Sequence, residues 1–254
     1  MQSRTKKKQV DITQYMVYII FVFAIAIFAL WLGGMFFSVT NLLNIIRQTA
    51  AISVMAVGMT FVLATGGIDL TISGIVPTAG LVSAMILNAT NNIFLGVAVP
   101  LAMGAVVGLA NGLLITFFTI PPFLVTLGMQ GVFIGVSMWV SNTKSVPIYN
   151  NTFNNIFGYG SVGGIPVLFF WILAFLILGI ILLNHTAFGR KVLAVGGNAA
   201  AAEYTGVKVN KVLIQTYILS GILSATAGLL YCGRTKAAKY TYGEGVEMDV
   251  IAAV

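Results

Sequence analysis

Long apolar segments alternate with short polar ones along most of this chain. Each apolar segment has about the roughly 20 residues that a helix needs to cross a hydrocarbon core. The segments lack the period-2 alternation of a transmembrane β-barrel, and in lipid only helices and closed barrels satisfy the backbone. We therefore predict an all-α, polytopic transmembrane helical bundle with about seven spans. The predicted spans are residues 15–37, 43–65, 72–89, 93–118, 123–140, 165–184 and 212–232.

The composition agrees with a protein solvated by lipid. Hydrophobic residues make up 59% of the 254 residues and charged residues only 7%, whereas soluble domains carry about 25% charged residues. Cys232 is the single cysteine and His185 the single histidine, so neither an internal disulfide nor a metal site built on these residue types is expected. We expect this chain to hold no metal and no cofactor.

The net charge of +7 comes mainly from short basic clusters between the apolar segments. Such clusters follow the positive-inside rule, so we interpret them as a topology signal and not as a surface for nucleic acid. The basic residues 1–14 are expected in the cytoplasm, and six crossings return residues 185–211 to that side. The Asn-rich segment 141–164 then lies outside. The exceptions to the rule follow the seventh span and are Arg234, Lys236 and Lys239.

The last apolar run is too short to cross a membrane. It begins at Val250 and ends with the sequence at Val254, whereas a spanning helix needs about 20 residues. We therefore expect residues 15–254 to form a transmembrane domain that is truncated at its C-terminus.

One acid lies between the second and third apolar runs. Asp69 follows a pair of glycines, which break a helix at low cost, and an acid at mid-bilayer costs about 2.5–3.5 kcal/mol unless it is paired or wetted. The segment is either a broken helix lining a substrate path or a tight turn at the cytoplasmic surface in which Asp69 caps the next helix. The candidates for lining a path share a polar group or a helix break; they are Gly66, Gly67, Asp69, Thr71, Ser73, Asn111 and Gln130.

Glycines recur at short spacing in two spans. Gly104, Gly108 and Gly112 lie four residues apart in the fourth span, and Gly131 and Gly135 do so in the fifth. Small residues at this spacing let two helix backbones approach closely. We interpret both stripes as intramolecular packing, with a dimerisation face as the alternative.

The segment 185–211 carries the signals of a short helix. Asn198 is a favourable N-cap, four alanines follow it, and Gly206 is a natural stop. The alanines give this helix a smooth face that a partner's groove can approach, although a solvent-exposed helix without a partner has the same pattern.

Four motifs, taken together and in order, resemble the permease subunits of ribose-type ABC importers for monosaccharides, from about Asn41 onward. The motifs are GGIDLT at 66–71, IPPFLVTLG at 120–128, TAFGR at 186–190 with GGN at 196–198, and DVIAA at 249–253. Each motif alone is weak, but four in order are specific.

This resemblance implies that the segment after the sixth span couples to a cytoplasmic ABC ATPase, which binds ATP and Mg. It also implies an extracytoplasmic sugar-binding protein, a second permease copy forming a homodimer, and an inner-membrane location. The residues assigned to coupling on this basis are Gly189, Arg190, Gly196, Gly197, Asn198, Ala201, Ala202, Glu203 and Gly206.

The sequence also bears on three other functional classes, an ATPase, an intramembrane enzyme and a different transporter. The chain has no G-x-x-x-x-G-K-[ST] phosphate loop, so import requires a partner that supplies energy. An intramembrane protease needs two aspartates, a Ser–His pair or an H-E-x-x-H zinc helix. Asp69 has no second intramembrane acid, no serine stands in a G-x-S-x-G motif and no H-E-x-x-H is present, so we expect no enzyme. A branched-chain amino-acid permease of a related family and a passive channel remain alternatives.

Overall fold

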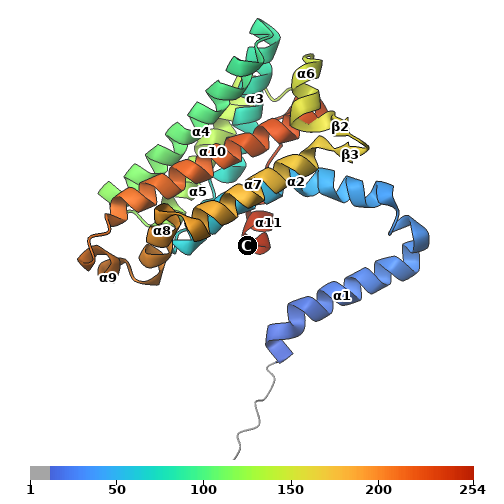
Figure 1. The fold of residues 1–254 in the computed structure, drawn as a ribbon. Helices are drawn as coiled ribbons and strands as arrows, with labels where there is room; N and C mark the ends of the chain where they lie inside the picture. The colour runs from blue at the N-terminus through green and yellow to red at the C-terminus, as the bar shows by residue number, and fades with distance from the viewer. Residues whose placement is uncertain (1–11) are drawn as a thin grey trace, which may run out of the picture. The chain divides into compact units, whose positions relative to one another are not determined.

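The computed structural model describes residues 12–254 (Figure 1). Most of the basic N-terminal segment predicted to be cytoplasmic, residues 1–11, lies outside the described residues. The chain divides into two compact units, residues 1–45 and 46–254. The first unit contains α1 (Ile12–Leu32), the short 3-10 helix η1 (Gly33–Met35) and the first residues of α2 (Val39–Ala64). In the turn before α2, the Asn41 side-chain amide donates to the Phe36 carbonyl at 2.8 Å.

The second unit is a bundle of helices. Among the described residues, seven helices are long and apolar enough to cross a membrane, which confirms the predicted all-α architecture with seven spans. The helices that follow α2 are α3 (Ile72–Thr90), α4 (Ile93–Phe117), α5 (Pro122–Ser141), α6 (Asn151–Asn154), η2 (Asn155–Tyr159), α7 (Val167–Ile180), η3 (Ile181–His185), α8 (Ala187–Gly197), α9 (Ala199–Tyr204), α10 (Val209–Thr235) and α11 (Val246–Ala253).

Helix α10 is the centre of this unit and packs most extensively against α4 and α3. A Cβ added at Gly104 would collide with the Gly221 carbonyl, and one added at Gly108 would collide with the Tyr217 carbonyl. The glycine stripe of α4 therefore packs inside the molecule, as predicted. On α5 the prediction is wrong for Gly131 and Gly135, because both are exposed and nothing lies within 4 Å of a Cβ added at either one.

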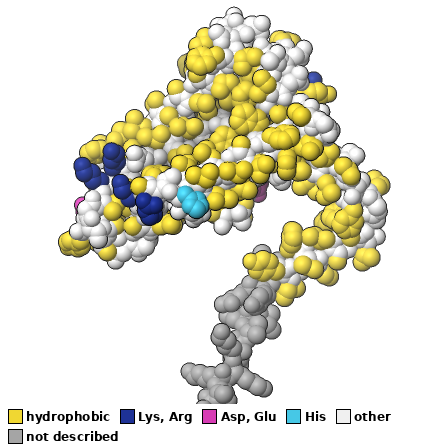
Figure 2. All heavy atoms as spheres, viewed as in Figure 1, with side chains coloured by type: hydrophobic (Ala, Val, Ile, Leu, Met, Phe, Trp, Pro, Cys, Tyr) yellow, Lys and Arg dark blue, Asp and Glu magenta, His cyan; other side chains and the backbone are white. Residues whose placement is uncertain are grey.

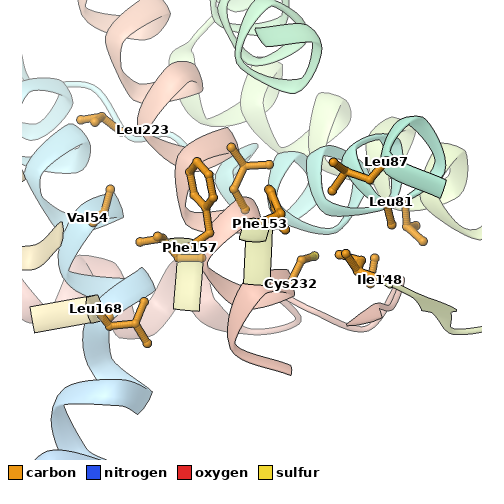
Figure 3. Close-up of a cluster of buried hydrophobic side chains, with 14 residues drawn as sticks. Val54, Leu81, Leu87, Ile148, Phe153, Phe157, Leu168, Leu223 and Cys232 are labelled. Carbon is orange, nitrogen blue, oxygen red and sulfur yellow. The ribbon is translucent and has the colours of Figure 1, made fainter. Parts of the chain in front are cut away.

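The segment 141–164 is more structured than an external loop. Strand β1 (Val146–Pro147) pairs with β4 (Ala237–Ala238), and β2 (Ser161–Val162) pairs with β3 (Ile165–Pro166). Phe153 and Phe157 stack at a centroid distance of 4.7 Å and enter an apolar core that Leu168 of α7 and Cys232 of α10 share (Figure 3). Burial of these aromatic side chains fixes the segment to the bundle.

The predicted coupling residues lie at the α8–α9 end of the bundle together with Arg190, Lys191, Lys208 and Lys211, and the cations Arg234, Lys236 and Lys239 lie at the other end of α10. Two of these exceptions have local partners. Arg234 donates to the Arg47 carbonyl at 3.0 Å and lies over the Tyr231 ring, and the Lys236 ammonium lies 3.5 Å from the centre of the Tyr159 ring. Each of these two cations is thus stabilised locally by an aromatic ring.

Candidate functional site

The helix break between α2 and α3 depends on its two glycines. Gly66 has φ +80°, a backbone conformation that disfavours other residues. A Cβ on Gly67 would lie 2.6 Å from the Tyr217 hydroxyl oxygen, so any larger residue at this position must displace that buried side chain. The amides of Gly66 and Gly67 still donate to carbonyls in the last turn of α2, and this bonding turns the chain sharply into the segment that carries Asp69.

Asp69 is fully buried, at 0% exposure, and both of its carboxylate oxygens accept hydrogen bonds. The Ser220 hydroxyl donates to Oδ2 at 2.7 Å, and the Thr71 backbone amide donates to Oδ1 at 3.0 Å. Ser220 lies 11 residues after the first residue of α10, or about 16 Å along that helix. Asp69 therefore lies near the middle of the bundle, and its interpretation as part of a surface turn is wrong.

Side chains from two further helices hold the break in place. The Asn111 amide of α4 donates to the Thr71 hydroxyl at 2.8 Å, and that hydroxyl donates to the Thr126 carbonyl of α5 at 3.2 Å. The Thr126 hydroxyl in turn contacts the Ile68 carbonyl at 3.2 Å. Buried polar groups are stable only when they are paired in this way. The structure thus brings Asp69, Thr71 and Asn111 into one polar cluster with Thr126 and Ser220, which sequence reasoning did not select as site residues.

A second polar contact lies two residues further along, at Ser73 near the start of α3. The Gln130 amide of α5 donates to the Ser73 hydroxyl at 2.8 Å and to Oε1 of Glu247 at 3.1 Å. Glu247 comes from α11, because the chain folds back after α10 and passes Gly243 close to Ser73 and Val76. Oε2 of Glu247 and Oδ1 of Asn111 are buried without a hydrogen-bond partner among the described residues. Both atoms are therefore hydrogen-bond acceptors without a donor.

Sequence reasoning missed Glu247 for a definable reason. The acid stands in a polar segment outside every predicted span, yet its carboxylate bonds to Gln130, which lies near the middle of α5. The prediction that Asp69 has no second acid at its depth is therefore wrong. The signal available beforehand was the run of glycines and tyrosines at 240–245, which is typical of a tightly packed turn.

The predicted short helix between the sixth and seventh spans is present as α9. The Asn198 side chain accepts a hydrogen bond from the Ala201 amide at 3.0 Å, and Gly206 ends the turn with φ +87°. Both predicted signals are confirmed. An additional helix, α8, precedes α9 and begins at Thr186, whose hydroxyl accepts from the Gly189 amide at 3.1 Å.

The residues assigned to coupling fall into two groups. Gly189 and Ala202 are buried, and a Cβ added at Gly196 would collide with the Ala64 carbonyl at the end of α2. Gly189, Gly196 and Ala202 therefore have packing roles within the chain. The exposed coupling residues are Arg190, Gly197, Asn198, Ala201, Glu203 and Gly206. Gly196 belongs to both groups, because it packs against Ala64 and is also exposed to solvent.

The fold and this site together define a multi-pass helical membrane protein with a buried polar break and an exposed helix between two spans. Residues 41–254 match the family described as branched-chain amino acid transport system / permease component. The chain belongs to this family of transport permeases, which confirms the resemblance seen in its motifs.

Individual relatives are sugar permeases by name. The ribose import permease protein RbsC of Escherichia coli K12 is 37% identical over 223 residues, which cover 86% of this chain and 69% of the relative. RbsC of Bacillus subtilis is 37% identical over 235 residues, or 91% and 72% of the two chains. The L-arabinose permease AraH of Azospirillum brasilense is 36% identical over 222 residues, or 86% and 64%. No solved structure matches the chain.

Proposed function

We propose that this chain is the membrane permease subunit of an ABC importer that carries a monosaccharide, with ribose as the first candidate. Relatives named for ribose and for arabinose have similar identity to the chain, which supports a small sugar as the substrate. The structural observation that carries the proposal is α9, an exposed, alanine-faced helix held between two spans. Such a face suits docking by a soluble subunit that supplies energy.

The proposed partners follow from this role. A separate ABC ATPase binds ATP and Mg and docks on the α8–α9 end, which we place in the cytoplasm together with the N-terminus, according to the positive-inside rule. A sugar-binding protein delivers substrate at the opposite end, where exposed Asn151 and Asn155 offer hydrogen bonds. Asn154 is buried and donates to the Ile148 carbonyl, so it is excluded from this contact.

We further propose that two copies of the permease assemble in the inner membrane. The glycines of α5 support this proposal, because they present a flat exposed surface of the kind that close helix contacts use. The substrate path is proposed to run beside the polar cluster. In this arrangement Gly66 and Gln130 are accessible from the path, while Gly67, Asp69, Thr71, Ser73 and Asn111 form the wall behind it.

Replacing Ala201 with tryptophan is expected to reduce sugar uptake by at least about tenfold, while membrane insertion is retained. Ala201 is exposed on α9, so the bulky side chain does not disturb the bundle but prevents close approach of the ATPase. The measurement is ATP hydrolysis and uptake in proteoliposomes that contain the permease, its ATPase and its binding protein. Ala102→Trp on α4 is the matched control, because Ala102 is also an exposed helical alanine. Equal loss in both variants contradicts a docking role for α9.

The same proteoliposomes test the substrate class. Radiolabelled ribose, arabinose and leucine are supplied separately, with and without ATP. We expect uptake of a sugar that depends on ATP by at least about tenfold, because the chain has no phosphate loop of its own. Uptake of leucine instead assigns the chain to branched-chain amino acids, and sugar uptake that persists without ATP identifies a passive channel.

A further inference from the structure

A groove of about 790 Å³ lies between η3, α8 and the start of α10. Three lysines line it, and apolar side chains from the three elements form its floor. Figure 2 shows basic side chains gathered at the end of the molecule where Figure 1 places α8 and α9. The residues that matter here are Lys191, Lys208, Lys211, Leu182, Phe188 and Leu219.

The polarity of the groove changes along the axis of α10. Lys211, Gln215 and Leu219 are spaced four apart and so lie on one face of that helix. The face runs from an exposed lysine to a half-buried leucine over about 12 Å. The groove is therefore cationic at the helix end and apolar toward the centre of the bundle, which is the polarity of a lipid headgroup followed by its acyl chain.

We propose that this groove binds one anionic phospholipid. The headgroup phosphate lies among Lys191, Lys208 and Lys211, and an acyl chain follows Leu182 and Leu219 toward the bundle centre. Basic pockets between transmembrane helices on the cytoplasmic side attract anionic headgroups. The proposal rests on the proposed function only for the orientation of the chain in the membrane. That orientation places the groove at the cytoplasmic side, so the lipid comes from the inner leaflet.

A second explanation makes a different prediction. If the lysines serve only to orient the chain during insertion, they give no preference among lipids after folding. The test is therefore a binding measurement on the intact permease, purified in detergent and titrated with phosphatidylglycerol or phosphatidylcholine. Native mass spectrometry counts the bound lipids and gives their affinities without any transport, so failure here is separable from failure of the proposed function.

We expect one phosphatidylglycerol per chain, bound at least about tenfold more tightly than phosphatidylcholine. The Lys208→Gln/Lys211→Gln variant is expected to weaken that binding by about tenfold or more, since each lysine near an anionic lipid contributes favourably. The matched control is Lys144→Gln/Lys239→Gln, which removes the same charge from two exposed lysines outside the groove and leaves the affinity unchanged. If the double variant fails to fold, Lys211→Gln alone is measured.

Three results overturn the proposal. The first is equal affinity for the two lipids, which means that the lysines of the groove do not select a negatively charged headgroup. The second is an unchanged affinity in the lysine variant, which places the lipid elsewhere. The third is full competition by millimolar inorganic phosphate, which identifies a site for soluble phosphate without a contribution from the acyl chain.

Discussion

Replacing Gly108 with alanine is expected to destabilise the permease by about 1–3 kcal/mol, the usual cost of adding a methyl group to a filled interior. The added Cβ would collide with the Tyr217 carbonyl and would lie 2.8 Å from the Ile218 Cα. Because both atoms belong to the backbone of α10, no side-chain rotation relieves the contact, and α4 must move away from α10. The measurement is the free energy of unfolding from an SDS titration of the purified protein.

Gly135→Ala is the matched control for this experiment. Gly135 is also a glycine inside a long helix, but nothing lies within 4 Å of a Cβ added there. Alanine is favoured over glycine in a helix by roughly 0.5–1 kcal/mol, so within one copy of the chain the control is expected to be neutral or stabilising. The titration is made on monomeric protein, so that the proposed contact between two copies does not contribute. A similar loss of stability in both variants contradicts the close α4–α10 contact.

Replacing Asp69 with alanine is expected to cost about 2–4 kcal/mol, because two buried donors lose their acceptor. The Ser220 hydroxyl and the Thr71 amide both bond to this carboxylate, and the side chain is fully buried, at 0% exposure. Folded protein in the membrane and uptake are expected to fall together by at least about fivefold. Fluorescence-detected size-exclusion chromatography reports the first quantity, and proteoliposome uptake reports the second.

Asp69→Asn separates a structural role from a role in transport. Its amide oxygen can still accept from the Thr71 amide, and its NH₂ group can donate to the Ser220 oxygen. We therefore expect folded yield and uptake within about twofold of the wild-type values. A folded Asn variant without uptake assigns the negative charge itself to transport, and a stable Ala variant excludes the structural role.

The sequence predicted the elements well wherever local chemistry decides them. Asn198 and Gly206 mark the ends of α9, and Gly104 and Gly108 mark the close contact with α10, because caps and close approaches depend on residue type. Helix α8 was not predicted, and it contains Gly189, Gly196 and Gly197, residues with low helix propensity. Two of these glycines are instead required where α8 packs against η3 and the end of α2.

Depth in the membrane was the main quantity that the sequence did not give. Counting crossings places every polar segment between two spans at a surface, so Asp69 was equally compatible with a turn and with a buried break. Its hydrogen bond to Ser220 decides the matter, and that pairing across 151 residues has no local signal. Glu247 was missed for the same reason, since only the chain reversal after α10 brings it to Gln130.

The close contact between Gly196 and Ala64 has a mechanical consequence. Gly196 lies in the last turn of α8, which leads into α9, and Ala64 is the last residue of α2, five residues before Asp69. Because backbone meets backbone at this point with no side chain between, the end of α8 cannot move toward α2 without displacing it. If an ATPase docks on α9 as proposed, we therefore expect a movement of α8 to reach the helix break at Asp69 through this contact.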